Sequence, residues 1–86
     1  MLITKQAVAE KITAYLQHEI GVEALAGWAE EAMQNAEFAE ADAPVLRNVV
    51  PRLGVSDVRA FGLAWEDCES MLGELGYSTR VEVTAI

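Results

Sequence analysis

The stretch "WEDCES" at residues 65–70 places the only cysteine of the chain, Cys68, among three carboxylates. A reactive cysteine needs a nearby cation to stabilise its thiolate, whereas neighbouring carboxylates raise the pKa of the thiol. Cys68 also shares a helical row with Trp65, Leu72 and Leu75, at spacings of three and four residues. We therefore expect Cys68 to be a buried structural residue and not a nucleophile.

Few residues of this chain could coordinate a metal ion. His18 is the only histidine, so a zinc site at Cys68 would need ligands from a second copy of the chain. Glu37, Glu40 and Asp42 could offer oxygens to calcium or magnesium, but they lack the glycine-turned ligand loop of an EF-hand. We expect His18 to lie in the last turn of a helix, where a partial positive charge is favourable, with a general base as the alternative.

Sequence motifs for catalysis are also missing. The chain has no phosphate-binding loop, dinucleotide fingerprint or nucleophile elbow. Pairs of carboxylates can be drawn from any acidic chain, so they do not indicate a hydrolase. We therefore predict a protein that is not an enzyme, with no catalytic residue, no metal and no cofactor.

The charge of the chain restricts its partners. Fourteen acidic residues against six basic ones give a net charge of −8, which disfavours nucleic acids and anionic membranes. Between Lys11 and Arg47 every charged residue is acidic. Such a run is typical of a solvated surface, and it would also attract a basic protein partner. For the second interpretation we select four partner-binding residues: Glu30, Glu31, Glu37 and Glu40.

The only basic grouping is formed by Arg47, Arg52 and Arg59. We interpret these arginines as ordinary surface charges. The alternatives are that they hold the acids of another helix or contact the carboxylates of a partner. No aromatic residue interleaves with them in the way that a nucleic-acid platform would require.

The length of 86 residues fits one domain over residues 1–86, because two domains of half that size would lack adequate cores. No segment is apolar for long enough to cross a bilayer, and the first residues lack the apolar run of a signal peptide. A single cysteine agrees with a reducing compartment, so we expect a cytoplasmic protein.

Apolar spacing predicts a mainly α fold, a small four-helix domain built on a helical hairpin. Thr4 should cap the first helix and Gly21 should end it. A second helix over residues 22–35 follows so closely that the two form a hairpin or a corner. Trp28 is the expected anchor between them.

The second half of the chain supplies two more helices. The third starts at Pro44 and contains Pro51, which should kink or shorten it. Residues 58–61 are ambiguous between a short turn and an extended segment, and we favour the turn. The fourth helix covers residues 65–75 and ends at Gly76.

The spacing of apolar residues changes from helical to alternating near the end of the chain. Residues 77–85 alternate in a pattern typical of a half-buried strand, which predicts a C-terminal β-strand. A lone strand is not stable, and its possible partners are residues 1–3, residues 58–61 or another chain. We favour pairing across a two-fold axis with a second copy, giving a homodimer. The self-pairing residues are Arg80, Val81, Glu82 and Val83.

The stretch "YLQHEIGVEALAGWAEEAM" at residues 15–33 resembles the helix, "EI" or "RI" turn and "WA" helix of small bacterial immunity-type proteins and related uncharacterised families. The matching positions are packing residues: Leu16, Ile20, Leu25, Trp28 and Ala29. The resemblance implies a protein without activity of its own that binds and neutralises a cognate toxin. No binding residue can be carried over from it.

These observations predict a small acidic, non-enzymatic protein-binding domain. An immunity-like protein that neutralises a basic partner is one form of that prediction. The alternative is a structural or assembly protein that acts through homo-oligomerisation. Neither nucleic acid nor a membrane is expected as a partner.

Overall fold

The computed structural model describes residues 2–85, which form a mainly helical fold with one short pair of strands. The helices are α1 (Lys5–Leu16), α2 (Val22–Asn35), α3 (Ala43–Gly54) and α4 (Trp65–Glu74), with a single 3-10 turn, η1 (Arg59–Phe61), before the last of them. The strands are β1 (Leu2–Ile3) and β2 (Glu37–Phe38). The predicted mainly α fold class is confirmed. No helix in this range is both long enough and apolar enough to cross a membrane.

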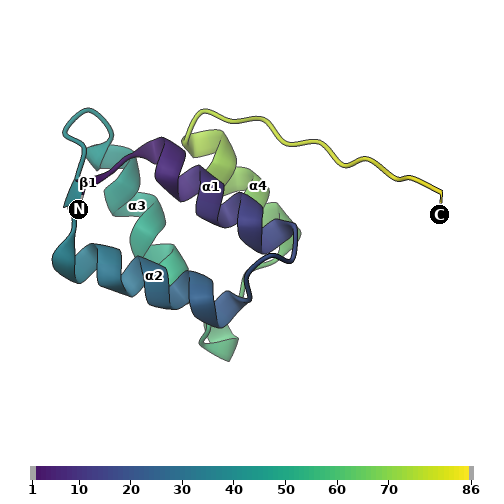
Figure 1. The fold of residues 1–86 in the computed structure, drawn as a ribbon, viewed down its shortest axis with the longest axis horizontal. Helices are drawn as coiled ribbons and strands as arrows, with labels where there is room; N and C mark the ends of the chain where they lie inside the picture. The colour runs from purple at the N-terminus through teal and green to yellow at the C-terminus, as the bar shows by residue number, and fades with distance from the viewer. Residues whose placement is uncertain (1, 86) are drawn as a thin grey trace.

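The helices pack around one shared core. α2 packs most extensively against α3, and α1 contacts the other three helices, passing in front of α4 in Figure 1. The largest fully buried side chains of this core come from β1 and from all four helices or their ends: Ile3, Val8, Ile12, Leu25, Leu46, Val49, Val50, Leu53, Cys68 and Leu75.

α1 begins directly after Thr4, the N-cap residue that the sequence predicts. The Thr4 hydroxyl accepts a hydrogen bond from the backbone N–H of Ala7 at 3.1 Å, as an N-cap residue should. The carboxylate of Asp42 accepts from the N–H of Lys5 at 3.0 Å. This second bond ties the first turn of α1 to the residue that precedes α3.

The end of α1 differs from the prediction, because the helix stops before Gly21. The N–H of His18 donates to the carbonyl of Tyr15 and that of Glu19 donates to Ala14, the paired bonds of a Schellman motif. His18 therefore takes the left-handed conformation, with a φ of 62°. It lies beyond the last turn rather than in it. Gly21, with a φ of −86°, precedes α2 as its N-cap instead.

α2 has the predicted bounds, but its packing is less centred on Trp28 than expected. Trp28 is half-buried at the edge of the core, with the Lys11 ammonium 5.7 Å from its ring centroid. The buried contacts of the hairpin come from Leu25 and Ala29. These residues lie on the face that α2 turns toward α1 and α3.

Gly54 leaves room for the end of the Met33 side chain where α3 meets α2. A Cβ atom on this buried residue would lie 2.7 Å from the terminal methyl carbon of Met33. Met33, predicted on the apolar face of α2, instead remains exposed and reaches across toward this position. α3 continues past Pro51 to Gly54, so the proline does not end the helix.

The turn predicted at residues 58–61 is confirmed as η1, and the predicted stop of α4 is confirmed at Gly76. Gly76 has a φ of 93°, and the N–H of Tyr77 donates to the carbonyl of Leu72. Trp65, however, was wrongly assigned to the core row and is 39% exposed. A helical side chain leans toward the helix N-terminus, so a residue at the first helical position extends past the core.

The predicted C-terminal strand is wrong for this chain. Residues 77–85 form no strand; they leave α4 and run on as an irregular tail, yellow in Figure 1. The observed sheet instead pairs β1 with β2 in parallel, Leu2 opposite Glu37 and Ile3 opposite Phe38. The tail alternates apolar and polar residues, but no strand pairs with it and its apolar side chains have no surface to pack on. Val81 and Val83 are therefore 67% and 95% exposed.

Candidate functional site

The four selected carboxylates lie in one continuous part of the chain. Glu30 and Glu31 are in the second half of α2, Glu37 is in β2, and Glu40 is in the turn before α3. All four residues are exposed, and within residues 2–85 none of them forms an ion pair or a side-chain hydrogen bond. They are therefore exposed charges that follow one another along residues 30–40 without an ion pair between them and any cation of the described chain.

Cys68 lies in the core, as predicted. The residue has no exposed surface, and its thiol is free of any disulfide. Burial raises the pKa of the thiol, the nearby charge of Asp67 raises it further, and Arg52 acts in the opposite direction. The thiol is consequently protonated at neutral pH, and it does not have the properties of an activated nucleophile.

Native Cys68 should react slowly with thiol reagents at neutral pH. Labelling with an iodoacetamide probe should proceed only as fast as the protein opens, and urea should accelerate it. Because the folded pKa lies above its ordinary value of 9.0, this residue stabilises the fold below that pH and loses the contribution as the pH rises through the folded pKa. Cys68→Ala should remove this alkaline dependence. Labelling at the rate of a free thiol in native buffer would show that the residue is accessible.

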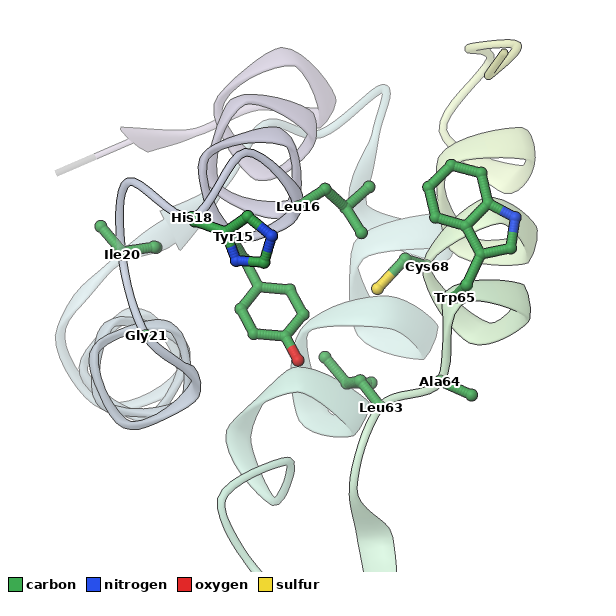
Figure 2. Close-up of a pocket in the computed structure, with 9 residues that line it drawn as sticks. All are labelled: Tyr15, Leu16, His18, Ile20, Gly21, Leu63, Ala64, Trp65 and Cys68. Atoms are coloured by element: carbon green, nitrogen blue, oxygen red, sulfur yellow. The ribbon is translucent and has the colours of Figure 1, made fainter. Parts of the chain in front are cut away.

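The first of two adjacent hollows lies between the end of α1 and the start of α4. Tyr15 and Leu16 form one side, His18 and Ile20 the turn after α1, and Leu63 and Trp65 the opposite side, around a volume of about 370 Å³. Figure 2 shows the Cys68 sulfur directed toward the space between Leu16 and Leu63. The lining is mainly apolar, which is typical of binding sites for apolar groups.

The second hollow lies next to the first and has a volume of about 540 Å³. Leu16 and Trp65 line both hollows, and Leu72 of α4 and Thr13 of α1 extend the wall. Residues 78–82 of the tail form its outer side. We call the two hollows together the α1/α4 groove.

The tail is attached to the groove wall by few polar contacts. The Thr79 hydroxyl donates to the Glu69 carboxylate of α4 at 3.2 Å. Arg80 pairs with Glu82 at 3.0 Å, but both side chains are highly exposed and both belong to the tail. An exposed ion pair of this kind contributes little to stability. The tail is therefore held beside the groove without being packed into it.

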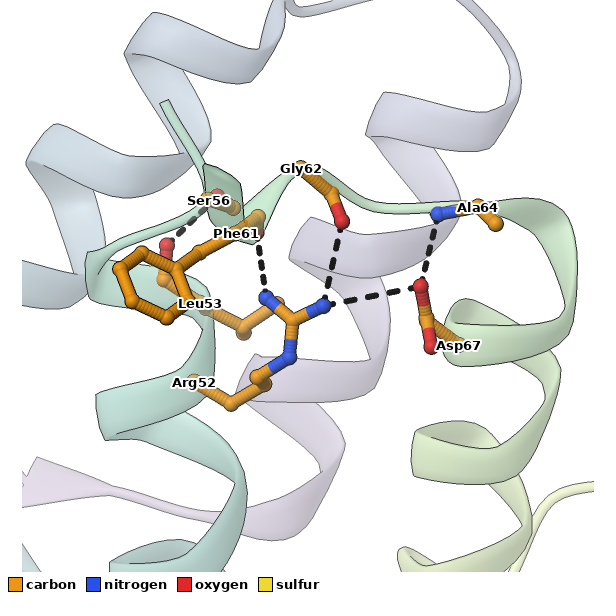
Figure 3. A network of polar contacts seen from close by, with 7 residues as sticks. All are labelled: Arg52, Leu53, Ser56, Phe61, Gly62, Ala64 and Asp67. Carbon is orange, nitrogen blue, oxygen red and sulfur yellow. Dashed lines mark hydrogen bonds and ion pairs between the residues drawn. The ribbon is translucent and has the colours of Figure 1, made fainter. Parts of the chain in front are cut away.

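Arg52 sets the position of the Leu63 side of the groove. Its guanidinium donates to the carbonyls of Phe61 at 2.6 Å and Gly62 at 3.1 Å, and it lies 3.5 Å from the Asp67 carboxylate. Asp67 in turn accepts from the N–H of Ala64 at 2.8 Å (Figure 3). Arg52 therefore joins α3 to the segment that leads into α4. For Arg52, contact with an acid of another helix is therefore observed, whereas Arg47 and Arg59 are exposed and form no ion pair within residues 2–85.

The groove contains polar groups, but their arrangement does not suit a covalent mechanism. No hydrogen bond joins the Cys68 thiol to His18 or Tyr15, so neither residue is placed as its base. Among residues 2–85, no three His, Cys, Asp or Glu side chains come close enough to share a metal ion. The arrangement can bury apolar side chains and offer hydrogen bonds at the rim.

Sequence reasoning missed this groove. The apolar spacing predicts that Leu16 and Trp65 lie on core faces, and it predicts no role for Leu63. The available signal was the position of Trp65 at the very start of a helix, where its side chain extends beyond the packed turns. The groove depends on how the end of α1 and the start of α4 come together, which no local pattern encodes.

Comparison with known proteins adds no relative: no protein-family model, curated protein or solved structure matches the chain.

Proposed function

We propose that this protein is a small, non-enzymatic domain that binds another protein, and that its partner is basic. The observation that supports this most directly is the set of exposed carboxylates at Glu30, Glu31, Glu37 and Glu40. Within the described chain, no cation forms an ion pair with any of them. The full sequence has a net charge of −8. Neutralisation of a cognate toxin, which the resemblance of residues 15–33 implies, would be one form of such binding.

The physical role of these carboxylates is attraction over distance. Exposed charges act over about 8 Å at physiological ionic strength, so a group of like charges accelerates the approach of an oppositely charged surface. Charged residues of this kind mainly change the association rate and its salt dependence. Their contribution to the stability of the fold is small, so they can be altered without unfolding the domain.

Reversal of all four residues to lysine should weaken capture of a basic partner. The bait is the full chain, applied to extracts of the cells that make it, and the captured proteins are identified by mass spectrometry. With the purified partner, the association rate should fall by about tenfold or more and lose most of its salt dependence. Circular dichroism should show an unchanged helical fold.

The matched control reverses four exposed acids elsewhere: Glu10, Glu23, Asp57 and Glu74. Both variants change the net charge equally, so a difference between them reports position and not total charge. If both sets weaken capture equally, only net charge matters. If neither does, or if no captured protein is basic, the proposed function is rejected.

A further inference from the structure

We infer that the α1/α4 groove binds an extended segment of the basic partner, in which apolar residues alternate with lysine or arginine, and that the tail pairs with this segment. The inference rests on the proposed function, because it assigns a place and a chain conformation to the basic partner. The groove residues differ from the four carboxylates, so an experiment can reject this inference without rejecting the proposed function.

The apolar side chains of such a segment have a site on the groove wall. Leu16 and Trp65 line both hollows, and Leu63 and Leu72 extend the wall on either side. The hollows have volumes of about 370 and 540 Å³, large enough for several aliphatic side chains. A partly exposed tryptophan at a concave junction is the type of residue that dominates binding energy at interfaces.

The tail supplies unused backbone groups beside this wall. Within the described chain, the N–H and C=O groups of residues 78–85 form no backbone hydrogen bond; the last such bond is donated by Tyr77 to Leu72. Figure 1 shows these residues running as an extended chain. An extended partner segment lying in the groove would satisfy these groups by strand addition. Val81 and Val83 would then gain an apolar neighbour.

The charges around the groove favour a basic occupant. Exposed acids adjoin the lining: Glu19 follows His18 and Glu66 follows Trp65 in sequence, and Glu69 accepts a hydrogen bond from Thr79. Glu82 is the acid that itself lines the second hollow. Arg80 is the only basic residue that lines the groove, and it is already paired with Glu82. A second copy of the tail would bring one arginine and one glutamate, so it would not neutralise these acids.

His18 adds an independent feature at the rim. It is the only residue other than glycine with a positive φ in the described chain, in a position where glycine is the least strained choice. An imidazole ring that can form hydrogen bonds therefore lies at a position where glycine would be less strained. Replacing it with glycine should relax the backbone and alter only the rim.

Three short synthetic peptides of equal length provide the test. One alternates leucine with lysine, one leucine with glutamate, and one serine with lysine. Each is titrated into the full-length, isotope-labelled protein while its amide NMR signals are followed. The leucine–lysine peptide should bind about tenfold or more tightly than either control, shift the signals of Leu16, Trp65 and residues 78–82, and protect the tail amides from exchange.

Three single variants separate the parts of the inference. Leu16→Gln should weaken binding of the leucine–lysine peptide by about tenfold, because it puts a polar group on the apolar wall. His18→Gly should weaken it by a few-fold while the melting temperature stays equal or rises. Val81→Pro, which removes a backbone donor, should remove the protection of the tail, whereas Val81→Thr should not.

Other outcomes assign the groove differently. Shifts confined to residues 30–40 would overturn the inference and leave the proposed function standing. Equal binding of the leucine–glutamate peptide would overturn the basic occupant. Absence of saturable binding by the leucine–lysine peptide would reject an extended basic segment. A free protein that light scattering shows to be a dimer, and that Val81→Pro makes monomeric, would assign the tail to a second copy, the homodimer alternative.

Discussion

Leu53→Ala should lower the free energy of unfolding by about 2–5 kcal/mol, a large effect for a single change in so small a domain. Leu53 is fully buried in α3 within the shared core. The substitution loses the transfer free energy of the removed carbons and leaves a cavity that close-packed neighbours fill only in part. Since small domains are stable by only about 5–15 kcal/mol, much of the stability would be lost.

Urea denaturation followed by circular dichroism measures this effect. The control is Val55→Ala, two residues further on, where the side chain is 40% exposed. Each kcal/mol lost should also lower the melting temperature by about 4–8 °C in a domain of this size. If the two variants unfold at the same urea concentration, Leu53 does not pack as the structure shows.

Arg52→Ala should destabilise the protein by about 1–2 kcal/mol and open the Leu63 side of the groove. The variant loses two hydrogen bonds to the carbonyls of Phe61 and Gly62 and the ion pair with Asp67. Charged hydrogen bonds of this kind are worth more than neutral ones, but the Arg52 side chain is 34% exposed and water replaces part of the loss.

Hydrogen exchange distinguishes this local effect from general weakening. The amide of Ala64, which donates to Asp67, should exchange faster in Arg52→Ala, whereas amides in the middle of α2 should change only by the global amount. Arg47→Ala is the matched control on the same helix, because this exposed arginine forms no ion pair or side-chain hydrogen bond within residues 2–85. Arg52→Lys should be intermediate, since an ammonium cannot reach both carbonyls in the fork geometry of a guanidinium. Equal exchange at Ala64 in all these variants would contradict the structural role of Arg52.

Much of the helical part of this protein is determined by short stretches of sequence. Thr4 caps α1, Pro44 lies in the first turn of α3, and Gly76 ends α4, because each residue acts on backbone groups a few positions away. The burial of Cys68 also followed from its spacing within one helix. In each case the interacting groups lie within one helix or its ends, so the feature can be predicted from the sequence alone.

Other features depend on partners far along the chain. β1 pairs with β2 across more than thirty intervening residues, and two-residue strands carry no pattern of their own. Residues 77–85 show the opposite case: they carry a clear alternating pattern, but no strand of the fold lies beside them. A strand requires hydrogen bonds from a neighbour, which the pattern of one segment cannot guarantee.

The candidate site divides in the same way. The exposed acids Glu30, Glu31, Glu37 and Glu40 were selected from sequence, because an unbroken run of acidic charge is visible there. The α1/α4 groove was not, since its lining combines the end of α1, the start of α4 and the tail, which lie far apart in the sequence. Periodicity assigns a side chain to one face of its helix, but whether that face meets another element or solvent at a given turn is decided by the packing of the helices in three dimensions.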